Sequence, residues 1–198
     1  MNAPEAIRRL LGVLLESGAV SAVLVPKRTP GNNMVTQALV TDQALLDGAD
    51  PLSPVQMVNA AHAVRELARE PLEQHEGKIA AVLRPCEVRA VIELIKLKQL
   101  LQDSLYLIGY DCPGVYDVRQ YRERVEAMGD ADKVRAEVLE RFGDITGNKA
   151  EAGTKASASA DPQVPLRGAC GVCTGFAADG ADLSFAWIGA EDYSLAVA

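Results

Sequence analysis

The stretch from Lys78 to Tyr110, KIAAVLRPCEVRAVIELIKLKQLLQDSLYLIGY, decides the fold of this chain. It begins and ends with short apolar runs of the kind that form buried strands. Between these runs, apolar residues recur at the spacing of a helix. We therefore predict strands at Lys78 to Leu83 and Leu105 to Tyr110, joined by a helix from Pro85 to Leu101. Such a β-α-β unit gives parallel, adjacent or near-adjacent strands with a right-handed crossover.

The segments on either side of this unit also predict helices and strands. On the N-terminal side we expect a helix from Pro4 to Glu16, a strand from Val20 to Val25, a hairpin arm from Thr36 to Thr41, and a helix from Ser53 to Glu70 with Ser53 as N-cap. On the C-terminal side we expect helices near Val118 to Met128 and Ala131 to Phe142, a flexible insertion at about residues 147–164, and a strand from Ala181 to Ile188 that carries Trp187. The prediction is one α/β domain over residues 1–198, with a mainly parallel sheet and flanking helices.

The composition is that of an acidic globular protein. Apolar residues make up 48% and charged residues 24% of the 198 positions, enough for one sizeable core. A net charge of −7 argues against nucleic acid or an anionic membrane surface as a partner. The sequence shows neither the basic-then-apolar order of a signal peptide nor an apolar run of the roughly 20 residues that a membrane-spanning helix needs. We therefore expect a cytoplasmic protein without membrane insertion, where clustered cysteines serve metal or redox chemistry.

Four cysteines carry the candidate chemistry. Cys86 follows the first strand of the β-α-β unit, Cys112 follows the second, and Cys170 and Cys173 form a C-x-x-C pair. Ligands of open α/β sheets gather at the carboxyl ends of parallel strands, and adjacent strands are about 5 Å apart. Cys86 also falls at a helix start, whose amides and dipole favour a thiolate. If the C-x-x-C pair closes the opposite side, the four thiolates suffice for one iron–sulfur cluster or one structural zinc.

Simpler interpretations of the cysteines stay open at this point. Taken singly, Cys86 and Cys112 are typical of small buried core residues. A structural zinc takes the same four ligands and would make the chain a scaffold or assembly domain. An isolated redox dithiol needs only Cys170 and Cys173, although thioredoxin-like C-x-x-C pairs open a helix directly after a strand, whereas this pair follows a polar segment. A histidine-rich metal site is excluded because the chain has only two histidines.

Basic and amide side chains near two strand ends are candidate contacts for a further cofactor. Lys27, Arg28 and Asn33 surround a turn after the first strand of the chain and could bind a phosphate or a flavin, although a solvated hairpin loop has the same composition. Arg84 and Arg89 flank the first cysteine and could raise a cluster potential or bind an anionic cofactor. No G-x-G-x-x-G follows a strand, so the usual dinucleotide fingerprint is absent from the sequence.

Four segments resemble one known family. They are ADPLSPV at residues 49–55, VNAAH at 58–62, AVLRPCEVRA at 81–90 and LIGYDCPG at 107–114. These motifs are similar to those of the beta-subunit family of coenzyme F420 hydrogenases and dehydrogenases, which includes formate dehydrogenase beta subunits. The similarity extends from about residue 7 to 115 and resumes at the C-x-x-C pair.

The resemblance implies an iron–sulfur electron-transfer subunit of a multi-subunit oxidoreductase of anaerobic metabolism, of the formate dehydrogenase or hydrogenase beta type. Matched position by position, it implies a [4Fe-4S] cluster on Cys86, Cys112, Cys170 and Cys173, and many relatives also hold FAD. Longer relatives often carry additional ferredoxin-type cysteine clusters, which this sequence lacks. The resemblance therefore also implies a hetero-oligomer in which other oxidoreductase subunits complete the electron path.

Overall fold

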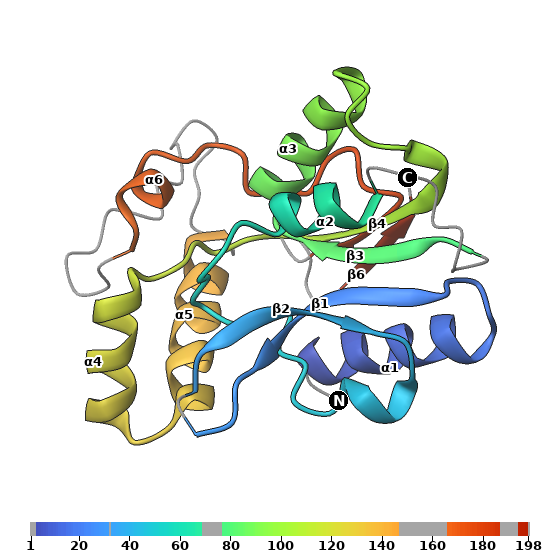
Figure 1. The fold of residues 1–198 in the computed structure, drawn as a ribbon. Coiled ribbons are helices and arrows are strands. Elements are labelled where there is room, and N and C mark those ends of the chain that lie inside the picture. Colours follow the sequence, from blue (N-terminus) through green and yellow to red (C-terminus); the bar gives the residue numbers. More distant parts are fainter. Residues whose placement is uncertain (1–2, 32, 69–76, 147–165, 187–193, 198) are drawn as a thin grey trace.

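A six-stranded sheet forms the centre of the computed structural model (Figure 1), which describes residues 3–31, 33–68, 77–146, 166–186 and 194–197. The strand order is β2-β1-β3-β4-β5-β6. Four strands are mutually parallel, namely β1 (Ala22–Arg28), β3 (Ile79–Leu83), β4 (Leu105–Tyr110) and β5 (Leu183–Ala186). The two edge strands, β2 (Val35–Val40) and β6 (Ser194–Val197), are antiparallel to their neighbours. The predicted α/β fold with a mainly parallel sheet is therefore confirmed.

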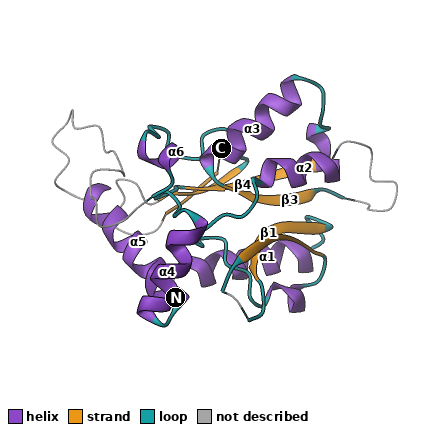
Figure 2. Ribbon diagram, turned by 60° about the vertical axis from the view of Figure 1, so that its left-hand side comes forward, coloured by secondary structure: helices purple, strands orange, loops and turns teal. Residues whose placement is uncertain are grey.

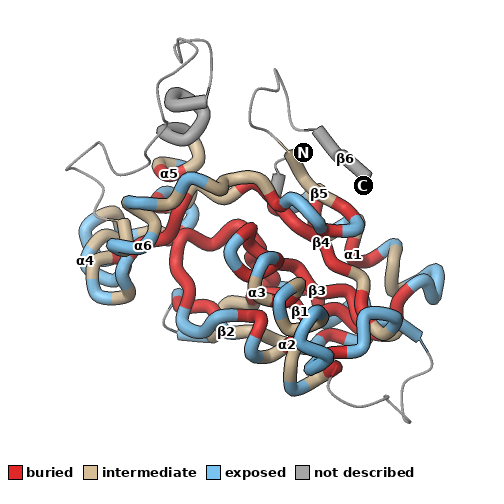
Figure 3. Tube along the Cα trace, turned by 90° about the horizontal axis from the view of Figure 1, so that it is seen from above, coloured by how far each residue is buried: buried red, intermediate tan, exposed pale blue. Residues whose placement is uncertain are grey.

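Helices cover both faces of this sheet. α2 (Ala60–Ala68) and α3 (Pro85–Lys96) lie on one face and α1 (Ala3–Glu16) on the other, as Figures 1 and 2 show. Along β3, Ala81 and Leu83 pack toward α2 and α3, whereas Ala80 and Val82 join the core on the α1 face. The central strands are thus buried on both sides (Figure 3), which explains why their sequences are almost wholly apolar.

The remaining elements lie around the sheet. α4 (Val118–Met128) and α5 (Ala131–Thr146) form a third small core with the hairpin end, in which the rings of Tyr116 and Tyr121 lie 6.5 Å apart. Short helical turns occur at η1 (Gln43–Leu46), η2 (Gln102–Ser104) and α6 (Gly168–Gly171). In the part of the chain that the structure describes, no helix is both long enough and apolar enough to cross a membrane.

The predicted β-α-β unit is confirmed as β3-α3-β4. The bounds of β4 are those predicted, and β3 begins one residue later than predicted. The helix ends at Lys96 rather than Leu101. Lys98 has a φ of +56°, in the left-handed region that a right-handed helix cannot continue through.

The predicted helix from Ser53 to Glu70 is wrong at its start, because α2 begins only at Ala60. The carbonyls of residues 53–56 all accept hydrogen bonds from outside the segment: those of Ser53 and Val55 from Arg84, that of Pro54 from the Tyr116 N–H, and that of Gln56 from Arg167. In a helix, each of these carbonyls would accept a hydrogen bond from the N–H of the residue four positions later. Asn59 accepts a hydrogen bond from the Ala61 N–H instead, and so starts the helix there.

Other differences concern element ends. The hairpin arm is displaced by one residue toward the N-terminus, α5 runs on to Thr146, and β5 begins at Leu183 rather than at Ala181. β6 was not predicted. Trp187 and the insertion predicted at about residues 147–164 lie outside the described residues.

Candidate metal centre

The four cysteines of the chain line one cavity of about 300 Å³ at the carboxyl ends of β3 and β4. β3 and β4 are parallel neighbours with Leu83 opposite Gly109, so the segments that follow them leave the sheet side by side. Cys86 lies in the first turn of α3, and Cys112 lies two residues beyond β4. Cys170 is in α6 and Cys173 follows it. The predicted meeting of the two strand-end cysteines with the C-x-x-C pair at one cavity is what the structure shows.

The C-x-x-C segment is attached to the chain that follows β4. The Cys112 N–H donates to the Phe176 carbonyl at 2.9 Å, and the Arg167 N–H donates to the Val115 carbonyl at 2.8 Å. Gly114, at a φ of +97°, permits the close approach: a Cβ there would lie 2.8 Å from Leu166 Cδ1. The turn after Cys112 therefore needs glycine both for its backbone angle and for space.

One buried carboxylate holds the start of α3 against the loop before α2. Glu87 is 1% exposed. Its Oε2 accepts from the Arg84 N–H at 2.9 Å, and its Oε1 accepts from the Ala60 N–H at 2.7 Å and from the Gln56 side chain. Glu87 thereby fixes the helix turn that carries Cys86. This role of Glu87 was not predictable from the sequence, because a glutamate near a helix start is usually a surface residue.

The thiols interact electrostatically. Partial burial raises the pKa of Cys86, and burial raises the pKa of Cys112 to about 12. Arg84 favours the thiolate form of both residues, whereas the charge of Cys170 raises the pKa of both. Without a cation the Cys112 thiol is thus protonated at neutral pH, and a bound metal would reverse this preference.

Arg84 places a buried positive charge beside these thiols. Its side chain is 2% exposed and lines the cavity. One guanidinium nitrogen donates to the Ser53 carbonyl at 2.8 Å and to the Val55 carbonyl at 3.3 Å. Burial alone lowers the pKa of Arg84, but the negative charges of groups around it outweigh this and hold the pKa above its ordinary value. Arg84 is therefore a cation at neutral pH.

The lining of the cavity suits an anionic, sulfur-ligated group. Among described residues, the only charged side chains that line it are Arg84 and Arg167, with the amides of Gln56 and Asn59. Four thiolates around a metal centre carry negative charge, which two guanidinium groups stabilise. No group of three or more His, Cys, Asp and Glu side chains in the described ranges has a metal-holding arrangement. The thiols share a cavity, but they do not form a closed coordination shell in this conformation.

The other predicted cofactor contacts lie away from this cavity. Lys27 Nζ donates to the Leu45 carbonyl at 2.7 Å, Arg28 pairs with two aspartates, and the carbonyl of Asn33 accepts from the Tyr121 hydroxyl at 3.1 Å. None of Lys27, Arg28 and Asn33 lines the cavity. Their predicted contact with a flavin or phosphate stays a prediction.

Sequence reasoning missed three polar residues of the cavity wall. Gln56 and Asn59 fell in a segment interpreted as helix, and Arg167 follows the predicted insertion. Arg167 donates to the Gln56 carbonyl at 2.6 Å and so joins two walls of the cavity. Asn59 lies in the segment VNAAH, one of the four that carry the family resemblance, and that was the one available signal.

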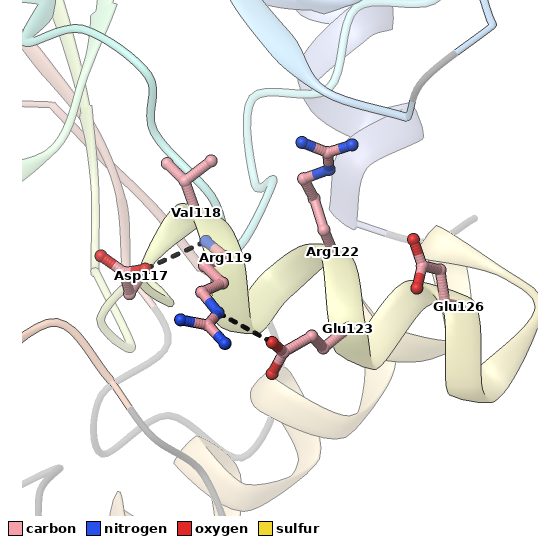
Figure 4. A pocket seen from close by; sticks show the side chains of 6 residues that line it. All are labelled: Asp117, Val118, Arg119, Arg122, Glu123 and Glu126. Atoms are coloured by element: carbon pink, nitrogen blue, oxygen red, sulfur yellow. Dashed lines mark hydrogen bonds and ion pairs between the residues drawn. The ribbon is translucent and has the colours of Figure 1, made fainter.

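A second hollow of about 420 Å³ lies along α4 and contains no cysteine. Figure 4 shows its lining, which comes from this helix and the preceding Asp117. Arg119 and Glu123 form an exposed ion pair at 3.0 Å within it, and Asp117 caps the helix. A groove of paired surface charges on one helix lacks the convergent walls of a binding site.

The fold and the cavity define an α/β protein in which four cysteines surround one hollow at the carboxyl ends of parallel strands. The family model for the C terminus of the beta subunit of coenzyme F420 hydrogenase/dehydrogenase matches residues 76–197. This match covers more than half of the chain, which therefore belongs to that family. The resemblance seen in the sequence is confirmed.

Two relatives extend this result. F420-dependent formate dehydrogenase 1 subunit beta of Methanococcus maripaludis is 28% identical over 128 residues, which cover 64% of this chain and 31% of that protein. A chain in the xenon-derivatised F420-reducing [NiFe] hydrogenase complex from Methanosarcina barkeri superimposes with a TM-score of 0.58 at 13% identity, over 96% of this chain and 66% of that one. The second likeness shows a shared fold. The chain spans about a third of the length of the curated relative that it matches.

Proposed function

We propose that this chain is an iron–sulfur electron-transfer subunit of a multi-subunit cytoplasmic oxidoreductase of the formate dehydrogenase or hydrogenase beta type. In this proposal one [4Fe-4S] cluster is held by Cys86, Cys112, Cys170 and Cys173. The observation that carries the proposal is that all four cysteines of the sequence line the same cavity. The names of the two relatives support the oxidoreductase class.

The residues around the cavity have distinct tasks in this proposal. A bound cluster would supply storage of a single electron. Arg84 and Arg167 offset the negative charge of the thiolates, and they favour the added electron because it makes the site more negative. Cys112 is half-buried, whereas Cys86 is exposed. A cluster ligand that reaches the surface gives electrons a short path to a partner.

Exposed aliphatic side chains beside the cavity support a protein partner. Met57 and Val58 lie between the lining residues Gln56 and Asn59, and Val172 lies between the two cysteines of the C-x-x-C pair. Their exposed fractions are 52%, 56% and 82%. Apolar side chains next to a polar cavity are typical of an interaction surface. We expect Val172→Asp to lose co-purifying oxidoreductase subunits in the native host while keeping its metal.

Two further points belong to the proposal and are tested by composition. A flavin, predicted near Lys27, Arg28 and Asn33, would copurify and convert hydride transfer into single-electron steps. A zinc-stabilised scaffold is the competing function, because zinc accepts the same four ligands. Flavin absorbance and zinc content separate these cases.

A reductive titration tests electron transfer itself. Dithionite is added anaerobically to the reconstituted chain while visible absorbance and electron paramagnetic resonance are recorded. The proposal predicts uptake of about one electron per chain, with a fast-relaxing paramagnetic signal and recovery of absorbance on reoxidation. Cys86→Ser serves as the matched control and should show neither. A colourless chain that takes up no electron would contradict the proposal.

A further inference from the structure

Two successive carbonyls tie the C-x-x-C segment to the carriers of the other cysteines. The carbonyl of Gly175 accepts from Arg89 Nη1 at 3.3 Å, and that of Phe176 accepts from the Cys112 N–H at 2.9 Å. Arg89 lies on α3, one turn after Cys86. The segment after Cys173 is therefore attached both to α3 and to the turn after β4.

Gly175 makes room for the Arg89 side chain. A Cβ on Gly175 would lie 2.6 Å from Arg89 Nη1 and 3.3 Å from its Cζ. The φ of Gly175 is not among the positive values of this chain, so its backbone does not require glycine. Glycine is needed at position 175 only because a larger residue would occupy the space of the Arg89 guanidinium. The clashing atoms are the end of a flexible side chain, so an alanine at 175 would displace the guanidinium without forcing the backbone to move.

The same carbonyl also contacts a predicted metal ligand. Cys173 Sγ donates to the Gly175 carbonyl at 3.6 Å. Arg89 thus bridges the two sides of the cavity: it stands on the helix of Cys86 and binds the carbonyl that Cys173 contacts.

We propose that Arg89 is a positioning residue, whose guanidinium lies against Gly175 and holds the C-x-x-C segment at the cavity. This proposal rests on the proposed function only where it takes the four cysteines to be metal ligands. The Arg89–Gly175 contact itself belongs to the protein and is measurable without a metal.

A double-mutant cycle on the metal-free chain tests this contact. Hydrogen exchange of the Cys112 amide and of residues 173–176 is followed in R89A, G175A and R89A/G175A. We expect about tenfold faster exchange in each single variant, from the loss of one charged hydrogen bond. The double variant should be no faster than R89A, because the displaced guanidinium is already absent. G168A is the matched control, since a Cβ at Gly168 meets nothing within 4 Å.

Two outcomes of the cycle would overturn the proposal. If the two residues act independently, the two tenfold effects multiply, and the double variant exchanges about a hundredfold faster than the wild type. That result would overturn the proposal. An exchange rate in G175A equal to that of the wild type would mean that the Arg89–Gly175 contact does not stabilise the C-x-x-C segment. A fold loss, seen as faster exchange across the β3 and β4 amides, is distinguished by measuring those strands in the same spectra.

The metal-loaded chain provides a readout that a purely structural role would not change. If iron is bound, its release to a chelator should be about 10–100-fold faster in R89A and G175A, as for other residues that support metal ligands. The midpoint reduction potential should fall in R89A, because a positive charge is lost, and fall less in G175A, which keeps it. If the wild-type chain binds zinc or no metal, the proposed function fails, and the exchange cycle still decides the role of Arg89.

Discussion

Arg28 and Arg84 stand at equivalent places in the fold but in different electrostatic surroundings. Arg28 ends β1 and Arg84 directly follows the adjacent parallel strand β3. Arg28 pairs with Asp50 at 2.9 Å and with Asp132, and Arg135 completes the group. Arg84 is more deeply buried, and within the described ranges its guanidinium forms no ion pair and donates to the carbonyls of Ser53 and Val55.

This difference separates a closed structural network from an open site. The two arginines and two aspartates around Arg28 balance one another in charge. The charge of Arg84 instead lies near the Tyr110 hydroxyl, the Glu87 carboxylate and the thiols of Cys112 and Cys86, whose ionised forms all favour it. A buried cation is costly unless anionic groups lie near it. We infer that Glu87 and, when ionised, the thiols of the cavity are those groups.

The largest expected effect is at the open site. Replacing any one of the four cysteines with serine should abolish metal binding about as fully as replacing another, because a four-thiolate centre needs each ligand. Metal content per purified chain is the measurement. Val172→Ala, between Cys170 and Cys173, is the control and should retain the full content. Undiminished metal in Cys86→Ser or Cys112→Ser would break the shared-site model.

The next effect is at the closed network. Asp50→Ala leaves Arg28 and Arg135 facing each other without the buried carboxylate that accepts from both. We expect the free energy of unfolding to fall by about 3 kcal/mol, as when one partner of a buried ion pair is removed. Urea denaturation of the metal-free chain measures this change. The affinity of the folded variant for metal should be unaltered, and a parallel loss of metal would show that the two regions are not independent.

Arg84→Met should have a smaller effect, which appears in the affinity for the metal and in its reduction potential. Methionine fills much of the same volume without charge, so the variant loses the stabilisation of the thiolates. We expect metal affinity to fall about 10–100-fold and the midpoint reduction potential to fall as well. Competition with a chelator and a potentiometric titration measure the two quantities. An unchanged potential would contradict the role given to this charge.

The smallest expected effect is that of Asp132→Asn. Hydrogen bonding from Arg28 lowers the pKa of Asp132, whose side chain is 53% exposed, so the pair should contribute only about 0.5 kcal/mol after solvent screening. This contribution is fully present above the unfolded pKa of about 3.9, and is lost as the pH falls through the folded value. Unfolding of wild type and variant at pH 7 and at pH 3 should show a difference that disappears at low pH. A difference that persists at pH 3 would exclude this ionisation as its cause.

The central fold was predictable because its signals are local. The apolar runs of β3 and β4 and the helical spacing between them identify the β-α-β unit without any knowledge of the remainder. The segment before α2 was not predictable in this way. Pro54 and Ser53 have the residue types of a helix start, but Arg84, Tyr116 and Arg167 take the carbonyls that a helix would need. Those donors lie 29 or more residues away in the chain.

The candidate site was predictable only in part for the same reason. Cysteines are few and follow strands, so Cys86 and Cys112 could be assigned to one edge of the sheet. Gln56 and Arg167 reach the cavity through tertiary contacts that no local pattern indicates. The role of Gly175 likewise depends on the guanidinium of Arg89, 86 residues away. Spacing alone also leaves iron and zinc as equal users of four thiolates.

The most direct test of the account is the metal and sulfide content of the wild-type chain purified without oxygen. Iron, acid-labile sulfide and zinc are measured per chain, together with the visible spectrum. The account predicts about four irons and four sulfides with a broad brown absorbance. One zinc per chain, without sulfide or colour, would contradict the electron-transfer function and assign the four cysteines to a structural site.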